Sequence, residues 1–230
     1  AEVLPPREGA RGSVSLELDF DRFSSESLLE QYLLEVKAIR EFSPEIPVTT
    51  NFMVGHDFDV VDYSQWTKHL DILSNDHYTI AVDEDRHQEL AFSADRMRGF
   101  RPQEPWLLME HSTSAVNWQP VNRAKGRGEM LRNALSHVAR GADGVMFFQW
   151  RASLSGAEQF HSGMVPHSGP DSRVFREVME LGEVLRRIGE VAGSQVDTPQ
   201  VAILFDNTAG WAWKSGTKPI NAFDLSGEPL

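Results

Sequence analysis

The sequence predicts an α/β fold built on a parallel sheet. Short apolar, β-branched segments alternate with amphipathic helical patterns four times along the chain. Polar residues capable of chemistry follow directly after these predicted strands. Strands separated by helical crossovers pair in parallel, and such folds place their functional residues at the carboxyl ends of the strands.

Two architectures satisfy this order, a (β/α)₈ barrel and an open doubly wound sheet. The chain has no Gly-x-Gly-x-x-Gly or Walker-type loop after a strand, which removes the usual reason for an open sheet. We therefore favour the barrel. Because four strand–helix units fit this chain and a barrel needs eight, we expect the C-terminal half of a barrel whose first half lies upstream of Ala1.

The predicted elements follow the spacing of apolar residues. Residues 1–20 are expected to form a loop, with an extended piece over 13–18. Ser27 and Glu30 match a capping box at the start of the first helix, 27–42. Further helices are predicted over 62–70, 85–100, 127–140 and 171–190, and strands over 47–53, 71–74, 106–110 and 144–150. Gly141 is the expected left-handed stop of the 127–140 helix.

A domain boundary is expected where the last long helix gives way to small and polar residues, at 191–195. Residues 200–206 have the pattern of a buried strand that opens a second domain. We therefore divide the chain into 1–192 and 193–230.

Composition restricts the partners. The 22 Lys and Arg against 34 Asp and Glu give a net charge of −12, which disfavours nucleic acid and anionic membranes and suits a neutral ligand such as a sugar. The chain has no cysteine, so its residues hold no disulfide, thiolate nucleophile or Cys-based zinc site. No apolar run is long enough to cross a bilayer. We expect a cytoplasmic protein without a membrane partner.

The residues 106–110 and 111–119 contain the principal catalytic candidate. Four apolar residues lead into Glu110, and the following segment is polar and has no helical or strand period. This pattern predicts a buried strand that delivers Glu110 to a cleft, although a lone Glu at a strand end can also be merely solvated. Glycoside hydrolysis uses a pair of carboxyl groups, while aromatic rings and planar polar groups hold the sugar. The candidate set comprises Tyr78, Glu110, Asn117, Trp118, Trp150, Arg151, Glu158 and His161.

Several of these residues have other interpretations. Trp118 and Trp150 can be core tryptophans, and Arg151 can serve only as the ion-pair partner of Glu110. Glu158 and His161 lie at a Glu-x-x-His spacing that also binds metals on helices.

Histidines outside this set receive no role, including His56, His111 and those within 69–87. Ser112 and Ser114 beside His111 lack the Gly-x-Ser-x-Gly elbow of many hydrolases, which disfavours acyl transfer.

Six sequence blocks, in order, resemble the β-galactosidases of glycoside hydrolase family 42. They are Phe20-Asp21-Arg22-Phe23-Ser24-Ser25, Val48-Thr49-Thr50-Asn51-Phe52-Met53, Leu107-Leu108-Met109-Glu110 with Asn117-Trp118-Gln119-Pro120, Gly141-Ala142-Asp143-Gly144, Phe148-Gln149-Trp150-Arg151, and Gly156-Ala157-Glu158-Gln159-Phe160-His161. The resemblance implies a retaining β-galactosidase on a (β/α)₈ barrel, followed by an α/β trimerisation domain that starts near 201–206. It also implies a homotrimer acting on galactosides.

The resemblance assigns roles to five residues. Glu110 matches the nucleophile at the end of the seventh strand, Trp118, Glu158 and His161 match galactose-binding positions, and Tyr78 lies beside the site after the sixth strand. No cofactor is expected. The zinc that some members hold through cysteines would lie in the half of the barrel that precedes this chain.

The chain departs from the family pattern at the proton donor. In the family this is the Glu of an Asn-Glu pair that ends the fourth strand, and no Asn here is followed by Glu. We therefore expect the acid/base Glu upstream of Ala1 and no useful turnover by residues 1–230 alone, since a half barrel also leaves open sheet edges. The alternatives are a catalytically incomplete sugar-binding or assembly fragment and a doubly wound binding protein.

Overall fold

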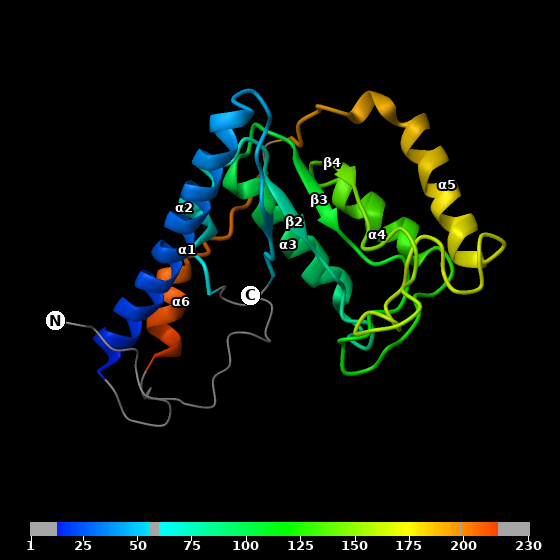
Figure 1. The fold of residues 1–230 in the computed structure, drawn as a ribbon, viewed down its shortest axis with the longest axis horizontal. Coiled ribbons are helices and arrows are strands. Elements are labelled where there is room, and N and C mark those ends of the chain that lie inside the picture. Colours follow the sequence, from blue (N-terminus) through cyan, green and yellow to red (C-terminus); the bar gives the residue numbers. More distant parts are fainter. Residues whose placement is uncertain (1–12, 56–59, 198, 216–230) are drawn as a thin grey trace. The chain divides into compact units, whose positions relative to one another are not determined.

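The computed structural model describes residues 13–55, 60–197 and 199–215, which fall into two compact units (Figure 1). One unit contains 49–55 and 72–197 and carries the sheet. The other contains the described parts of 1–48, 56–71 and 199–230 and is helical. Each unit is treated separately below.

The sheet has four parallel strands in the order of the sequence. They are β1 Asn51–Phe52, β2 Ser74–Asp76, β3 Trp106–Glu110 and β4 Ala142–Val145. Each strand pairs with the next one along the chain. A doubly wound sheet reverses its strand order at a switch point, whereas successive barrel strands do not. The order therefore confirms a partial (β/α)₈ barrel and excludes the open sheet.

Three helices of this unit lie between or after the strands, α3 Arg86–Phe100, α4 Glu129–Val138 and α5 Arg173–Arg187. Helix α3 buries Leu90, Ala94 and Met97, which share one face because they are four and three residues apart. Met130 and Ala134 of α4 pack with Val178 and Leu181 of α5 in an apolar cluster. The three helices confirm the predictions for 85–100, 127–140 and 171–190, with shorter ends.

A register shift in the sheet turns the end of β3. Asn75 pairs with Leu108, but the next residue of β2, Asp76, pairs with Glu110, so Met109 is extra. Regular alternation would place Trp106 and His111 on opposite faces. Both rings instead contact His137 of α4, at 5.7 and 5.8 Å between centroids. The bulge reconciles these contacts, because one inserted residue exchanges the two faces.

Gly141 links α4 to β4 with φ +99°, a left-handed conformation that favours glycine. This confirms its predicted role as the stop of the helix. The strand after it begins and ends earlier than expected, at 142–145 rather than 144–150. Strand β2 likewise begins at Ser74 rather than at 71, and β1 is confined to two residues of the predicted 47–53.

The helical unit contains α1 Val14–Phe42, α2 Tyr63–Trp66 and α6 Asn207–Lys214. The rings of Tyr32 and Trp66 lie 5.4 Å apart, and Asn207 Nδ2 donates to the Val61 carbonyl at 2.6 Å. Asp71 accepts from the Val48 amide at 2.6 Å and forms an ion pair with Arg40. These contacts hold the helices and the segment 60–71 together.

Three predictions for this unit are wrong. The extended piece over 13–18 is helical, because α1 begins at Val14. Ser27 and Glu30 therefore lie inside a helix, where the same spacing places two residues on one face without any cap. The predicted 62–70 helix is only one turn long.

The predicted strand at 200–206 is also absent. Residues 201–206 form no strand in the described part of the chain, and Leu204 is 96% exposed. Apolar, β-branched residues form a strand only where a neighbouring strand accepts their backbone hydrogen bonds. Asp206 caps α6 instead, since its side chain accepts from the Ala209 amide at 2.6 Å.

Within 13–55, 60–197 and 199–215, no helix combines the length and the apolar character that a bilayer crossing requires.

We predict that Leu108→Ala destabilises the fold by about 2–5 kcal/mol, because it leaves a cavity behind a fully buried strand residue. The matched control is Leu154→Ala, whose side chain is 77% exposed and whose loss costs less than about 0.5 kcal/mol. Denaturant unfolding of the intact protein that carries this chain measures both. Equal losses in the two variants would contradict this assignment of the core.

Candidate active site

Glu110 ends β3 and accepts a hydrogen bond from the Tyr78 hydroxyl at 2.6 Å. Tyr78 lies in the segment that follows β2, so neighbouring strands supply the two residues. Burial raises the pKa of Tyr78, and the hydrogen bond to Glu110 raises it further. The phenol therefore remains protonated and holds one carboxylate oxygen of Glu110 in place.

Asp76 lies opposite Glu110 in the sheet register. Asn51 Nδ2 donates to one of its carboxylate oxygens at 2.9 Å, and the other is buried without a partner among the described residues. Burial raises the pKa of Asp76 to about 6, the Asn51 hydrogen bond opposes this rise, and the charge of Glu110 adds to it. The sequence alone gave Asp76 no role.

Aromatic rings surround Tyr78. The ring centroid of Trp118 lies 5.4 Å away and that of His161 5.8 Å away, both edge to face. Trp118 is 54% exposed, so part of its indole is accessible to solvent. An accessible indole near a carboxylate is suited to stacking on the apolar face of a sugar ring.

The loop that carries Glu158 and His161 is held against the strand ends. Val165 N donates to the Trp150 carbonyl at 2.8 Å, and Ala152 N donates to the Val165 carbonyl at 3.0 Å. Gly163 lies so close to this backbone that a Cβ would approach the Ala152 nitrogen to 2.5 Å. Glycine at this position therefore allows the loop to bring His161 to Tyr78.

Several buried polar atoms near this site have no hydrogen-bond partner among the described residues. They are Asp76 Oδ1, Asn117 Oδ1, Gln149 Nε2, Glu158 Oε2 and His161 Nε2. A buried polar atom without a partner costs about 1–3 kcal/mol. Such a concentration of unpaired donors and acceptors beside an open indole is typical of a site that binds hydroxyl groups.

The structure thus brings together the five predicted site residues. Tyr78 contacts Glu110, Trp118 and His161 directly, and the charge of Glu158 contributes to the raised pKa of Tyr78. Their roles stay predictions, because geometry alone does not assign a reaction.

The other interpretations find no support in the structure. In the part of the chain that the structure describes, Arg151 forms no ion pair with Glu110, and Glu158 and His161 belong to no group of three potential metal ligands. Trp150 is exposed and therefore not a core residue. His56 lies outside the described residues.

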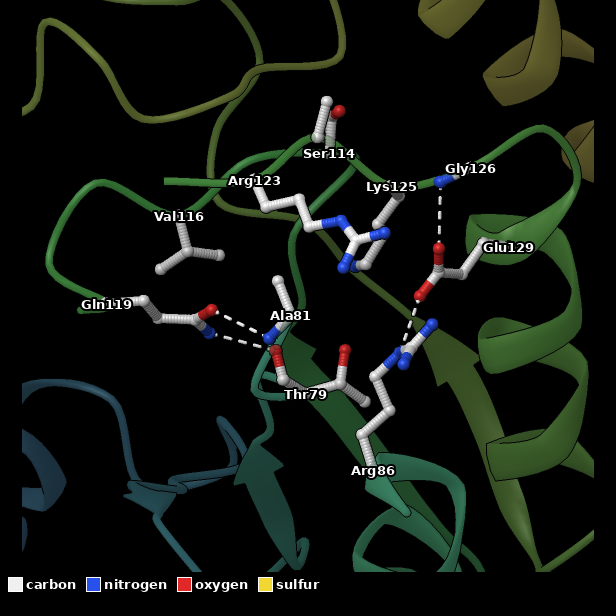
Figure 2. Close-up of a pocket in the computed structure, with 11 residues that line it drawn as sticks. Thr79, Ala81, Arg86, Ser114, Val116, Gln119, Arg123, Lys125, Gly126 and Glu129 are labelled. Carbon is white, nitrogen blue, oxygen red and sulfur yellow. Dashed lines mark hydrogen bonds and ion pairs between the residues drawn. The ribbon is translucent and has the colours of Figure 1, made fainter. Parts of the chain in front are cut away.

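A separate pocket of about 270 Å³ lies between the loops after β2 and β3 (Figure 2). Gln119 bridges the two loops, because its amide accepts from Ala81 N at 3.0 Å and donates to the Thr79 carbonyl at 2.8 Å. Arg86 Nε donates to Glu129 at 2.9 Å on the opposite wall. These contacts fix the position of the segment that carries Trp118.

Comparisons with known proteins agree with this geometry. The sequence model of the β-galactosidases of glycoside hydrolase family 42 matches residues 1–188. A β-galactosidase from Arthrobacter sp. is 53% identical over 221 residues, which cover 95% of this chain and 31% of the relative. β-Galactosidase BbgII from Bifidobacterium bifidum is 42% identical over 235 residues, which cover all of this chain and 34% of the relative.

Solved β-galactosidase structures have the same fold. One from Rahnella sp. R3 superposes with a TM-score of 0.88 at 36% identity and covers 96% of this chain and 34% of its own. Another, from Bacillus circulans sp. alkalophilus, superposes with a TM-score of 0.88 at 33% identity. The match covers 96% of this chain and 33% of the solved one. The chain spans about a third of the length of the proteins it matches.

We predict that Asp76 makes the folded state less stable as the pH rises from about 4 to about 6. Its folded pKa, about 6, lies above the ordinary value of 3.8, so the stabilising effect of its proton is complete below 3.8 and is lost on titration through 6. Asp76→Asn cannot titrate, so it lacks this loss of stability. The loss in the wild type amounts to about 1 kcal/mol of unfolding free energy after allowance for solvent screening.

Unfolding free energies of the intact protein across this pH range measure the difference. The matched control is Asp197→Asn, whose side chain is exposed and which keeps the wild-type profile. Identical profiles for wild type and Asp76→Asn would show that Asp76 does not titrate in this range.

Proposed function

Because this chain belongs to the β-galactosidases of glycoside hydrolase family 42, we propose that it supplies the nucleophile half of a retaining β-galactosidase site, with Glu110 as the nucleophile. The observation that carries this proposal is the hydrogen bond from Tyr78 to Glu110 within a group of unpaired, buried polar atoms. A carboxylate held in this way has a fixed direction of attack.

In the first step, a carboxylate oxygen of Glu110 bonds to the anomeric carbon of a terminal β-galactoside. The glycosidic bond breaks, and its oxygen leaves as an alcohol after it takes a proton from an acid. The product is a galactosyl-enzyme ester. In the second step, the same acid, now a base, removes a proton from water, which attacks the anomeric carbon and releases galactose and the Glu110 carboxylate.

We place the acid outside this chain. The chain contains no Asn-Glu pair of the kind the family uses. Retention requires a second carboxyl group about 5–5.5 Å from the nucleophile, across the scissile bond. Asp76 is on the neighbouring strand, at the same end as Glu110, and is hydrogen-bonded to Asn51. We therefore assign Asp76 to tuning the charge beside Glu110.

The sugar hydroxyls would meet the unpaired atoms. Glu158 Oε2 is an acceptor, while His161 Nδ1 faces the Ser162 carbonyl at 2.9 Å and so carries the proton. His161 Nε2 is then an acceptor as well. Acceptors on one side suit the donor hydroxyls of a pyranose, and Trp118 walls the pocket through its accessible indole.

Other parts of the proposal concern the intact protein. We propose that residues 193–230 begin the trimerisation domain, that the intact protein is a homotrimer, and that it works in the cytoplasm. The exposed Val201, Ile203 and Leu204 support the first part, because apolar side chains of this size are normally covered in a completed domain. For residues 1–230 alone, the site geometry favours galactose binding without turnover.

We predict that Glu110→Gln lowers kcat of the intact protein by at least about 10³-fold, because an amide cannot form the ester. The matched control Glu104→Gln, on the exposed side chain that pairs with Arg101, leaves kcat unchanged. A 2-fluorogalactoside with a good leaving group should label the wild-type peptide that contains Glu110, as detected by mass spectrometry. Galactose binding without labelling would instead favour a non-catalytic sugar-binding protein.

We predict that Tyr78→Phe lowers kcat/KM by roughly 10- to 100-fold, the value of one hydrogen bond to a charged acceptor. Tyr32→Phe is the matched control, because the Tyr32 hydroxyl lies in the helical unit and has no partner among the described residues. Steady-state kinetics on a nitrophenyl β-galactoside compare the two. Wild-type kinetics for Tyr78→Phe would remove Tyr78 from the site.

A further inference from the structure

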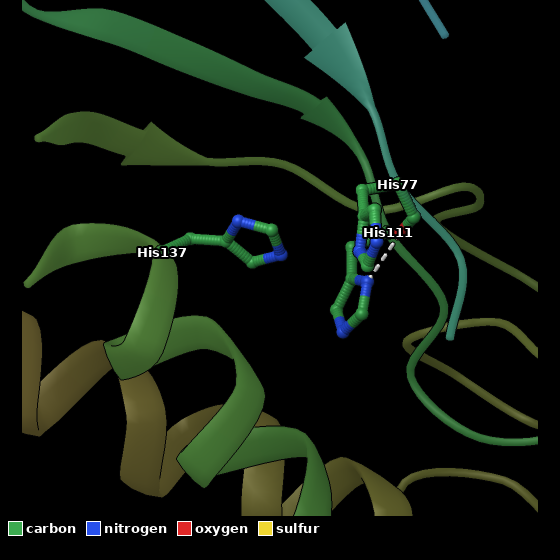
Figure 3. A group of neighbouring side chains, drawn as sticks. All are labelled: His77, His111 and His137. Atoms are coloured by element: carbon green, nitrogen blue, oxygen red, sulfur yellow. Dashed lines mark hydrogen bonds between the residues drawn. The ribbon is translucent and has the colours of Figure 1, made fainter. Parts of the chain in front are cut away.

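Three buried histidines form a cluster beside the strand ends (Figure 3). His77 follows β2, His111 follows β3, and His137 belongs to α4. The ring of His137 points toward the other two rings. Each offers one ring nitrogen, and these three nitrogens all lie within 4.8 Å of one another. His111 and His137 are 0% exposed, and His77 is 4% exposed. The cluster takes no part in the proposed galactosidase chemistry.

The hydrogen bonds of His77 leave one nitrogen available. Its Nε2 lies 2.6 Å from the Glu89 carboxylate, and its Nδ1 is buried with no partner among the described residues. A carboxylate that accepts from one ring nitrogen of a histidine is the usual support for a metal bound by the other, because it orients the ring and increases its basicity.

His111 is oriented in the same way. Its Nδ1 lies 2.6 Å from the His77 carbonyl oxygen. A carbonyl oxygen can only accept, so Nδ1 carries the proton and Nε2 presents a lone pair. Nε2 lies 3.2 Å from the Lys125 ammonium, which can only donate. The ring therefore carries one proton, the neutral form in which histidine binds a metal.

His137 is the least satisfied residue of the cluster. Neither of its ring nitrogens has a hydrogen-bond partner in the described parts of the chain, although the side chain is fully buried. A buried polar group without a partner destabilises the folded state. Its contacts are ring to ring, at 5.0 Å from His77 and 5.8 Å from His111. An imidazole in such a position lacks a partner that a bound ion would supply.

We propose that His77 Nδ1, His111 Nε2 and one ring nitrogen of His137 bind a single divalent transition metal ion of the zinc class. Three imidazoles suit zinc, cobalt or nickel, whereas Mg²⁺ and Ca²⁺ prefer oxygen ligands. Zinc–nitrogen bonds of about 2.0–2.1 Å require the three nitrogens to move closer together. No hydrogen bond among the described residues fixes the His137 ring, so its rotation can supply part of this movement.

Lys125 is the competitor of the metal. Its buried ammonium donates to His111 Nε2 at 3.2 Å and to the Ser112 hydroxyl at 2.7 Å, and it also bonds to the Ser112 carbonyl. Metal binding breaks its bond to His111 and leaves the two bonds to Ser112, so the amine must move away from the ion.

The proposed ion would act on the structure rather than on the sugar. His77 N donates to the Glu110 carbonyl at 2.9 Å, and His111 is the residue after Glu110. An ion bound by these histidines and by α4 would connect the ends of β2 and β3 to that helix. It would therefore hold in place the backbone that presents Glu110 on the other face.

The test measures metal content of the intact protein, stripped with a chelator, re-loaded with zinc chloride and dialysed. We expect wild type to retain about one equivalent more zinc per chain than His137→Gln. The exposed His87→Gln is the matched control and keeps the wild-type content. Metal held elsewhere in the protein is common to all three and cancels. Equal zinc content in wild type and His137→Gln overturns the proposal.

Two further measurements do not depend on the folding of His137→Gln. Cobalt(II) added to stripped wild type should give the intense visible absorption bands of a tetrahedral site. X-ray absorption of the same sample should show scattering from imidazole ligands. Absence of either signal counts against the site. Lys125→Met should bind cobalt at least about 10-fold more tightly, because it removes the competing hydrogen bond. Weaker binding by Lys125→Met would assign the cluster to a metal-free polar network or to a buried water instead.

Discussion

The insertion of one residue at the end of β3 determines the organisation of the site. Because Asp76 pairs with Glu110 while Asn75 pairs with Leu108, the strand turns by one position at Met109. Glu110 then meets Tyr78 and Asp76 on one face, while His111 meets His137 on the other. Without this shift, the carboxylate and the histidine would exchange faces, and neither polar cluster could form.

The two faces of the strand ends satisfy their polar groups differently. On the Glu110 face, acceptors of Glu158, Asn117 and His161 lack partners beside an exposed indole, as expected where a polar ligand completes the hydrogen bonds. On the helix face, Lys125 and Glu89 pair with two of the histidines but leave His137 without a partner. In both arrangements, buried polar groups without partners lie next to the end of β3, the segment that carries Glu110 and His111.

Membership of the β-galactosidase family and the sequential parallel sheet together define what this chain contributes. Four neighbouring barrel strands carry the proposed nucleophile and the sugar contacts, and the chain spans about a third of its relatives. Retaining hydrolysis needs two carboxyl groups across one bond. Under the proposed retaining mechanism, the nucleophile and its acid are far apart along the sequence, although the reaction requires them within a few ångströms.

The sequence by itself determined the alternation of elements, the strand 106–110 and the stop at Gly141, because buried apolar runs and left-handed glycines are local signals. The family resemblance also predicted that Glu110, Tyr78, Trp118, Glu158 and His161 belong to one site, and their roles stay predictions. Only the tertiary structure decided the bulge at Met109, the place of Asp76 and the histidine cluster, since each depends on pairing between segments distant in sequence. The missing strand at 201–206 has the same cause: a strand exists only where a partner accepts its hydrogen bonds.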